Sequence, residues 1–417
     1  MTLQVVNYEK SGPDTPVNLG TLDDLWVGRA GLVLSTNGGY AIYGFGSYHT
    51  LHIEGAVSGG NGIYLGYYTS LDSYNSVVIA STGVVYGIIY SIHMSGINAR
   101  LDNFGLLDGT VYFEGYGPSQ SRIYNAGDII DNDNAIVHVG TETLSLSNTG
   151  TIRTAVATFV STDATAIDLI RNRGDMTGDI LLGGGDDRYD GRGGFVDGTV
   201  FGEAGNDTFR PGGGIELFDG GLGVDTLDFR STSGVRVYLD GSGPNTGSAE
   251  GDDYVGIETM LGSARGADVL GGDAANNVLR GYGGADTLAG GSGADALVAG
   301  VGIDLVFGGL GDDSFYFEKP GDGGDVIGDF AAVVGNNDTF RFWAPGFGGG
   351  LVAGALPAAQ FQSRADNLAQ DADDRFIFRT TDQTLWFDSN GNGAGGLTLV
   401  ADLQSGAVVT AADILIY

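Results

Sequence analysis

The chain has 417 residues, of which 42% are hydrophobic, 76 are glycine and none is cysteine. Glycine without a strict triplet, together with this apolar content, excludes collagen and a disordered polymer, and the missing cysteines exclude disulfides and thiolate metal sites. Its 19 Lys and Arg against 52 Asp and Glu give a net charge of −33, which makes nucleic acid and anionic membranes poor partners.

Residues 20–180 read as short strands in an array of similar coils. Apolar runs such as YAIYGF (40–45) and SVVIA (76–80) alternate with Gly, Asn, Ser and Asp. A loose repeat recurs as NFGLLDG, NAGDIID, NTGTIRT and NRGDMTG, whose glycines at 105, 127, 150 and 174 are 22, 23 and 24 residues apart. Gly31, Gly55 and Gly83 extend this series upstream. Such a period predicts a parallel β-helix, with an antiparallel sandwich as the alternative.

Two segments bear on the membrane and on export. The uncharged run from Ser76 to Ile92 is interrupted by polar residues and glycines, so it favours buried strands over a membrane-spanning helix. The N-terminal residues show neither the basic nor the apolar region of a cleavable signal peptide. We therefore expect no membrane insertion.

From about 182 to 316 the period shortens to nine residues. Three units follow one another over 202–228, and six more over 263–316. The layout is Gly-Gly-x-Gly-x-Asp-x-apolar-x, as in GYGGADTLA (281–289) and GGSGADALV (290–298). In the second block the sixth position is Asp in five units and Asn in one. Such a conserved register predicts a structural role for this position in every coil.

The remaining segments are plain strands. The interlude 229–262 contains VRVYLDG (235–241) and VGIETMLG (255–262), which we expect to separate the two repeat blocks. Residues 317–417 predict a small β domain with one helical or looped excursion at 356–370.

The nine-residue layout has a chemical consequence. The glycines permit a positive φ and let carbonyl groups turn inward, the aspartate follows the turn, and the alternating tail forms a strand. Two units complete one coil, so Asp268 should lie above Asp286 and Asp286 above Asp304. Carboxylates about 4.8 Å apart repel one another unless a cation lies between them, and Ca²⁺ favours such oxygen ligands. The alternative is that each Asp bonds only its own turn.

These units resemble the glycine-rich nonapeptide repeats of the RTX family, which implies a parallel β-roll filled with several Ca²⁺ ions. The resemblance implies carboxylate ligands in the sixth position and carbonyl ligands in the glycine turn. Glu216 and Asn277 replace Asp, and the unit of Asp187 is offset from the next, so the implication is weaker there. The implied metal site comprises Asp187, Asp207, Asp225, Asp268, Asn277, Asp286, Asp295, Asp304 and Asp313, with Gly281, Gly283, Gly290 and Ser292.

The C-terminal region resembles the segment that follows such repeats in serralysin-like proteins, notably in FYFEKPGDGGDVIGDF (315–330). The resemblance implies a type I secretion signal near the C-terminus and export directly to the outside. It also implies that the repeats stay extended at low cytosolic calcium and fold on Ca²⁺ outside the cell.

The expected fold class is all-β, a right-handed parallel β-helix continuing into a calcium-bound parallel β-roll, with a small C-terminal β domain. The expected segments are the β-helix at 1–180, a first repeat block at 181–228, the strand interlude at 229–262, a second repeat block at 263–316, and the C-terminal domain with its secretion signal at 317–417.

The sequence leaves open whether the chain is an enzyme. No H-E-x-x-H motif and no lipase-type G-x-S-x-G elbow occurs. His93 and His138 each lie 12 residues before a glycine of the series, which would place them on one face two coils apart. No catalytic residue is assigned. We expect a secreted calcium-binding protein with a structural, adhesive or surface-layer role, and its partners to be calcium and the type I secretion machinery. The alternative is a β-helix that binds or modifies extracellular polysaccharide as a lyase or epimerase.

Overall fold

The computed structural model describes residues 2–66, 74–331 and 336–417, and the chain folds into two compact units. Unit 1 comprises Met1–Asp225 and Asp252–Gly256, and unit 2 comprises Thr226–Gly251 and Ile257–Tyr417. Nearly all regular structure in the described residues is β-strand, which confirms the all-β class. The five predicted segments remain a prediction.

Unit 1 contains two parallel sheets. The β1 sheet consists of β1 (Leu3–Val6), β4 (Asp24–Val27), β7 (Thr50–Ile53), β9 (Ser76–Ile79), β11 (Arg100–Asn103), β13 (Gln120–Asn125), β16 (Thr143–Asn148), β18 (Asp168–Asn172), β20 (Arg188–Asp190) and β23 (Thr208–Arg210).

The β2 sheet consists of β2 (Glu9–Gly12), β3 (Val17–Leu19), β5 (Leu32–Ser35), β6 (Tyr40–Gly44), β8 (Ala56–Leu65), β10 (Val84–Ser95), β12 (Leu106–Glu114), β14 (Asp128–Ile130), β15 (Asn134–Val139), β17 (Thr151–Ser161), β19 (Asp175–Leu181), β21 (Phe195–Asp197), β22 (Thr199–Phe201), β24 (Leu217–Asp219) and β27 (Asp253–Val255).

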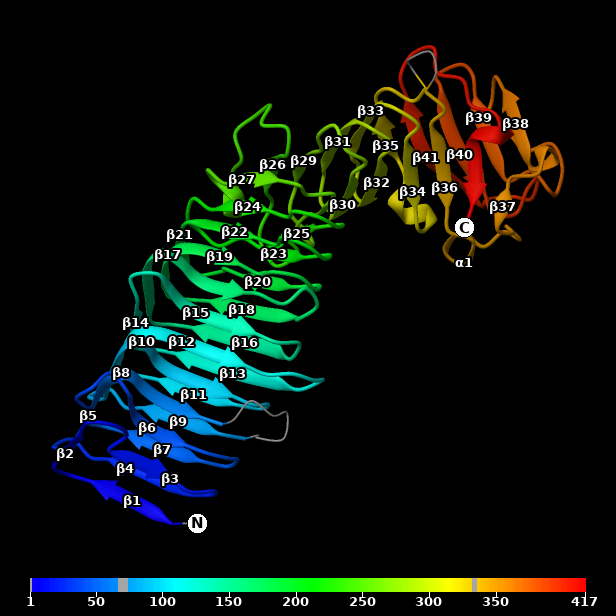
Figure 1. Ribbon diagram of the computed structural model, residues 1–417. Helices are drawn as coiled ribbons and strands as arrows, with labels where there is room; N and C mark the ends of the chain where they lie inside the picture. The colour runs from blue at the N-terminus through cyan, green and yellow to red at the C-terminus, as the bar shows by residue number, and fades with distance from the viewer. Residues whose placement is uncertain (1, 67–73, 332–335) are drawn as a thin grey trace. The chain divides into compact units, whose positions relative to one another are not determined.

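These strands form a parallel β-helix, as predicted. Each strand pairs with the equivalent strand of the next coil, so β4, β7, β9, β11 and β13 lie side by side in succession (Figure 1). One fully buried column runs through Ile42, Ile63, Ile92, Val111 and Ile136, which occupy the same register position in successive strands. The core therefore lies inside the coils. The run from Ser76 to Ile92 forms β9 and most of β10, and no helix among the described residues is long and apolar enough to cross a membrane.

The predicted glycine series marks a close approach between successive coils. A Cβ on Gly105 would lie 2.2 Å from the carbonyl oxygen of Gly83, and one on Gly127 would lie 2.2 Å from that of Gly105. Gly150 and Gly174 stand in the same relation to the glycine below, at 2.1 Å. Only glycine fits these positions, because a side chain there would overlap the backbone of the previous coil.

A second ladder lies two residues before these glycines. Asn103, Asn125, Asn148 and Asn172 are fully buried, and each Nδ2 donates to the Oδ1 of the next, over 2.7, 2.8 and 2.9 Å. The Gly105 N–H donates to the Asn103 Oδ1 at 3.1 Å. Buried amides are tolerated when they are hydrogen-bonded, so this ladder fixes the register of the coils. The sequence analysis missed it.

Unit 2 also contains two sheets. The β25 sheet consists of β25 (Thr226–Asp228), β28 (Thr259–Leu261), β30 (Val278–Gly283), β32 (Ala296–Val301), β34 (Ser314–Phe317), β36 (Thr339–Phe342), β37 (Gly354–Ala355) and β42 (Ile414–Ile416). The β26 sheet consists of β26 (Arg236–Tyr238), β29 (Val269–Gly271), β31 (Thr287–Ser292), β33 (Leu305–Leu310), β35 (Asp325–Ile327), β38 (Phe361–Arg364), β39 (Phe376–Arg379), β40 (Thr384–Asp388) and β41 (Leu397–Leu403).

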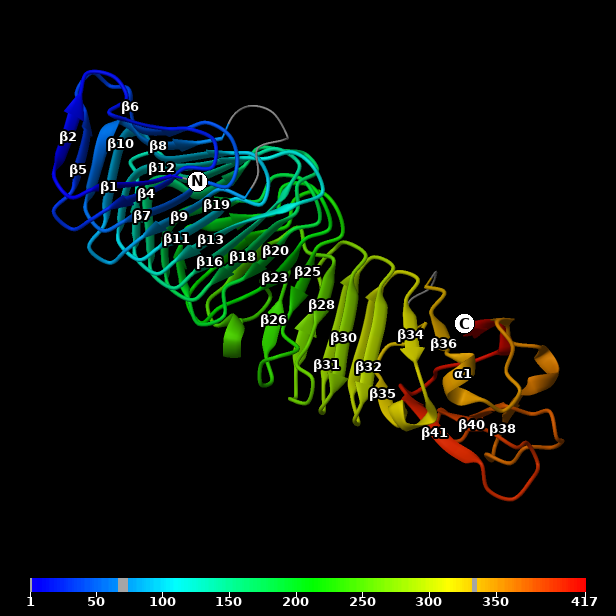
Figure 2. The same cartoon turned by 90° about the horizontal axis from the view of Figure 1, so that it is seen from below.

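The coil of unit 2 spans 18 residues, as the nine-residue repeat predicts. Val269 pairs with Thr287 and Thr287 with Leu305, while Val278 pairs with Ala296 in the other sheet. Figure 2 shows β28, β30 and β32 following one another, with β31 running between them in the chain. Coils this short leave room for one inward apolar side chain per strand, such as Leu288.

The C-terminal strands extend the same two sheets. β41 pairs with β35, and β42 pairs with β36. Strands near the end of the chain therefore pair with the strands that directly follow the repeats. β40 runs antiparallel to both of its neighbours, β39 and β41. The predicted excursion at 356–370 contains a short 3₁₀ turn and β38. The helical segments are α1 (Ala344–Phe347), η1 (Gly247–Ala249), η2 (Pro320–Asp322), η3 (Ala358–Gln360) and η4 (Ala411–Asp413).

Candidate metal centre

The repeat turns use glycine where the backbone is left-handed. In the units that begin at residues 202, 220, 281, 290 and 308, the second and fourth positions both have positive φ, for example 107° at Gly291 and 118° at Gly293. Tyr282 and Glu203 occupy the second position with φ of 71° and 70°, a conformation uncommon for residues other than glycine. The turn geometry expected from the glycine layout is therefore present.

In unit 2 the sixth-position side chains form two ladders, one along each edge of the roll. The Asp268 N–H donates to Asp286 Oδ1 at 2.8 Å, and the Asp286 N–H donates to Asp304 Oδ1 at 2.8 Å. On the other edge, the Asn277 N–H donates to Asp295 Oδ1 at 2.7 Å and the Asp295 N–H to Asp313 Oδ1 at 2.9 Å. The predicted stacking is confirmed, and each carboxylate bonds the coil before it rather than only its own turn.

Unit 1 carries the same arrangement. The Asp168 N–H donates to Asp187 Oδ1 at 2.6 Å, the Asp187 N–H to Asp207 Oδ1 at 2.8 Å, and the Asp207 N–H to Asp225 Oδ1 at 2.7 Å. The spacing here is 19, 20 and then 18 residues. The offset in sequence therefore does not break the ladder, because the extra residues are absorbed between the turns.

The second carboxylate oxygen of these side chains is buried and, among the described residues, accepts no hydrogen bond. This holds for the Oδ2 atoms of Asp187, Asp207, Asp286, Asp295, Asp304, Asp313 and Asp325. Burial of a carboxylate oxygen away from water costs free energy of folding unless a positive charge or a hydrogen-bond donor takes the place of the water. Such an atom recurs at successive turns of both units.

Backbone carbonyls lie beside these oxygens. A Cβ on Gly281 would lie 2.4 Å from Asp286 Oδ2 and 2.6 Å from the Ala299 carbonyl oxygen, and one on Gly290 would lie 2.2 Å from Asp295 Oδ2 and 2.5 Å from the Gly308 carbonyl oxygen. The first glycine of each unit thus keeps a space bordered by oxygen atoms of two coils. No group of three or more His, Cys, Asp or Glu side chains suited to a metal occurs in the described part of the chain. Carboxylate and carbonyl oxygens together are the donors that Ca²⁺ prefers.

Burial changes the protonation of the ladder. Loss of solvent raises the pKa of Asp286 and of Asp295 to about 7 and that of Asp313 to about 6, against an ordinary 3.8, although each accepts a stabilising backbone N–H bond. In unit 1 it raises the pKa of Asp187 to about 8. Neighbouring aspartates add to the effect. The ionised ladder is therefore unfavourable without a compensating positive charge.

Three of the predicted ligand positions are already satisfied within the chain. Asp268 Oδ2 accepts from the Ser263 N–H at 2.7 Å and lies 3.1 Å from the Ser263 hydroxyl. The Asn277 amide accepts from the Asp273 N–H and donates to the Ile257 carbonyl. Glu216, the weaker candidate, accepts from the Gly212 N–H and the Tyr189 hydroxyl. The side-chain oxygens of these three residues therefore already accept hydrogen bonds from the chain, and they stabilise the turns rather than offer a free ligand atom.

The remaining predicted ligands lie in the turns as follows. Gly281 and Gly283 are in β30, and Gly290 and Ser292 are in β31. Asp225 continues the ladder of unit 1. The sequence analysis missed Asp325, whose Oδ1 accepts the Asp304 N–H at 3.0 Å, because 21 rather than 18 residues separate the two. A search for Asp after the last strict repeat would have found it.

The two histidines do not share a face. His93 pairs with Tyr112 and Tyr112 with Val137, whereas His138 pairs with Phe113, which pairs with Met94. The two side chains therefore occupy alternate positions, and the prediction of one face was wrong because irregularities in β10 shift the register between coils. His138 Nδ1 lies 2.9 Å from Asp168 Oδ1, with both side chains fully buried.

The raised pKa values predict how calcium binding depends on pH. Because the folded-state pKa values of about 6 to 8 lie above the ordinary 3.8, the metal-free fold is most stable below about pH 3.8 and loses stability as pH rises from there to the folded-state values. Protons also compete with Ca²⁺ for the carboxylates. We therefore expect the gain in strand signal on adding Ca²⁺ to be smaller at about pH 5.5 than at about pH 8, because the protonated ladder is already partly folded without the metal.

Far-UV circular dichroism of calcium titrations at several pH values measures this dependence. In EGTA, the strand signal should be larger at acidic than at alkaline pH. A signal in EGTA that does not change with pH would show that the buried carboxylates do not limit the stability of the metal-free repeats.

Comparison with protein families agrees with this geometry. The model of the RTX calcium-binding nonapeptide repeat (4 copies) matches residues 197–227, 264–297 and 290–319. These ranges contain most of the two ladders, so the predicted repeats are confirmed. The match ends at residue 319, so the resemblance of the C-terminal region to serralysin-like proteins stays a prediction. A search of curated proteins found no match.

Proposed function

We propose that this chain, which carries RTX calcium-binding nonapeptide repeats, is a secreted protein whose repeats fold on Ca²⁺ outside the cell and that it has a structural, adhesive or surface-layer role there. Repeats of this kind bind Ca²⁺ and are typical of secreted proteins. The extracellular role is inferred from an array built of stacked coils with large exposed faces.

One observation carries the proposal: a buried carboxylate oxygen without a hydrogen bond recurs in register along both ladders. Ca²⁺ would supply the missing positive charge. The residues that would hold it are Asp187, Asp207 and Asp225 in unit 1, and Asp286, Asp295, Asp304, Asp313 and Asp325 in unit 2, together with carbonyl groups of the glycine turns.

The chain's own residues make folding sensitive to this charge. The backbone N–H groups hold each Oδ1, the glycines keep side chains out of the space beside each Oδ2, and the net charge of −33 opposes compaction. At cytosolic calcium levels the repeats would stay extended, which suits export by a type I pathway. At the millimolar calcium found outside cells, binding and folding occur together, since binding free energy adds to folding free energy.

Limited proteolysis of the full chain tests the proposal. In EGTA, cleavage should concentrate within 182–316, whereas the coils of 1–180 stay protected by their apolar core. Addition of millimolar Ca²⁺ should protect 182–316, and excess EGTA should reverse this. Equal cleavage of 182–316 with and without Ca²⁺ would contradict the proposal.

A further inference from the structure

The outer face of the β1 sheet concentrates arginine in an acidic chain. Arg100, Arg122 and Arg188 occupy one register column, together with Ser145 and Leu169. The neighbouring outward column contains Asp102, Tyr124, Ser147, Arg171 and Asp190. The residues between these columns, such as Ile123, point into the core. Four arginines thus follow one face over successive coils, although the chain has only 19 Lys and Arg.

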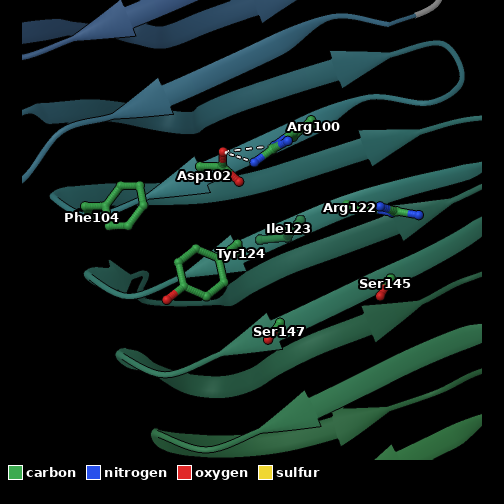
Figure 3. Close-up of a pocket in the computed structure, with 8 residues that line it drawn as sticks. All are labelled: Arg100, Asp102, Phe104, Arg122, Ile123, Tyr124, Ser145 and Ser147. Atoms are coloured by element: carbon green, nitrogen blue, oxygen red, sulfur yellow. Dashed lines mark hydrogen bonds and ion pairs between the residues drawn. The ribbon is translucent and has the colours of Figure 1, made fainter.

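This face is hollowed along the arginine column. A groove of ≈ 440 Å³ is lined by Arg100, Asp102, Phe104, Arg122, Ile123, Tyr124, Ser145 and Ser147 (Figure 3). A second hollow of ≈ 280 Å³ shares Ser145 and is lined also by Leu169, Ile170, Arg171, Arg188 and Asp190. Both hollows are lined by Ser145 and follow the same strands, β11, β13, β16, β18 and β20, and we call them together the arginine groove.

The charge of the arginine groove is positive. Arg100 is paired with Asp102 at 2.7 Å, so these two charges balance. The Arg122 guanidinium donates to the neutral side chain of Gln120 at 3.2 Å and is exposed to solvent. Asp190 is held by Arg192 at 2.7 Å and by Arg173 at 3.1 Å. Arg122 and Arg171 therefore add positive charge to the groove in a chain of net charge −33.

One edge of the groove is aromatic. The rings of Phe104 and Tyr124 lie 5.6 Å apart between centroids, and Phe104 is 44% exposed. Figure 3 shows the two rings side by side at one end of the strands, with Arg100 and Arg122 at the other. On the next strand, Ser145 continues the column of Arg100 and Arg122, and Ser147 continues the column of Tyr124. Cationic, hydroxyl and aromatic groups thus line one open, elongated surface.

We propose that the arginine groove binds a linear acidic polysaccharide, with sugar carboxylates on the arginines and apolar sugar faces on Phe104 and Tyr124. Guanidinium groups bind carboxylates through two parallel hydrogen bonds, and exposed rings offer an apolar surface with a polar rim. Coils spaced by about 4.8 Å repeat these groups along a line, which suits a polymer with regularly spaced charges rather than one small anion. The proposal names a binding partner for the extracellular role proposed above. It rests on that role only in assuming that the protein meets the polysaccharide outside the cell.

A matched pair of variants tests the proposal in the full chain with calcium present. The test variant is Arg100→Gln/Arg122→Gln. The control, Arg29→Gln/Arg153→Gln, makes the same change in net charge at exposed sites away from the groove, in the β4–β5 turn and on β17 of the β2 sheet. Calorimetric titration with short oligogalacturonate measures binding, and dextran serves as the neutral polymer.

We expect oligogalacturonate to bind the unmodified chain and dextran not to bind. The test variant should weaken binding about tenfold or more, Tyr124→Ala should weaken it without any change in charge, and the control should stay within about twofold. Added salt should weaken binding, because the groove is open to solvent. The calcium midpoint of folding should be the same in all variants, which separates this test from that of the repeats.

Several results would overturn the proposal. They are no binding by the unmodified chain, equal losses in the test and control variants, or equal binding of single-stranded DNA, which would indicate a general polyanion surface. If the test variant loses binding and its circular dichroism spectrum also changes, Tyr124→Ala decides the question, because it leaves both arginines in place. Unchanged binding by Tyr124→Ala would then contradict the proposal.

Discussion

Replacement of Asp286 by asparagine is expected to weaken calcium binding and, in the same protein, to stabilise the calcium-free repeats. The amide oxygen can still accept the Asp268 N–H, now held by Oδ1 at 2.8 Å. The amide nitrogen replaces the buried Oδ2, so the uncompensated charge is removed. Asn277 shows that the turn accepts this side chain, since its amide is bonded on both sides.

The expected size follows from the charge. Loss of one ligand carboxylate should raise the calcium midpoint of folding of unit 2 about tenfold or more, equivalent to about 1.4 kcal/mol. Relief of a buried, unsatisfied charged oxygen should stabilise the metal-free form by about 1–3 kcal/mol. The effect should appear in EGTA at alkaline pH as a larger strand signal in circular dichroism.

The control is Asp240→Asn, which makes the same charge change in an exposed turn of unit 2, where Asp240 Oδ1 accepts the Ser242 N–H. It should change neither the calcium midpoint nor the calcium-free signal measurably. If Asp286→Asn lowered the stability of both forms alike, Asp286 would be a structural side chain and not a ligand.

Gly127→Ala is expected to have the largest effect on unit 1. The new Cβ would lie 2.2 Å from the Gly105 carbonyl oxygen and 2.7 Å from the Gly105 nitrogen, and these are backbone atoms that cannot rotate away. The coils would have to separate, which would also stretch the Asn103–Asn125 hydrogen bond of 2.7 Å. Because overpacking and a broken buried network act together, we expect a loss of about 4 kcal/mol or more.

Gly12→Ala is the matched control, because a Cβ on Gly12 meets no atom within 4 Å. It should change stability by less than about 1 kcal/mol, and a small gain is possible through the unfolded chain. Urea unfolding in saturating calcium, followed by hydrogen exchange of residues 103–150, measures both variants. Equal stability of the two variants would contradict the close coil contact at Gly127.

The periodic features of the fold were predictable from the sequence. The glycines at 105, 127, 150 and 174 and the sixth-position aspartates recur at fixed spacing, because every coil presents the same backbone contact to the next. Sequence spacing therefore translates directly into stacking. The asparagines two residues before these glycines have the same spacing, so their ladder was equally predictable.

Features that depend on coil length were not predictable. His93 and His138 have equal distances to their glycines, yet β-bulges in β10 place them in alternate register positions. Asp325 follows Asp304 after 21 residues instead of 18, so a search at fixed period passes over it. That Ser263 satisfies Asp268 depends on the folded turn, and no linear motif marks it.

The central claim is that cations lie beside the carboxylate ladders. A crystal structure of the full chain grown in millimolar Ca²⁺, with anomalous diffraction data, tests it directly. We predict anomalous peaks beside Asp286, Asp295, Asp304 and Asp313, next to the Oδ2 atoms that accept no hydrogen bond. Well-ordered turns without such peaks, with these oxygens bonded to water or to the chain instead, would contradict the account.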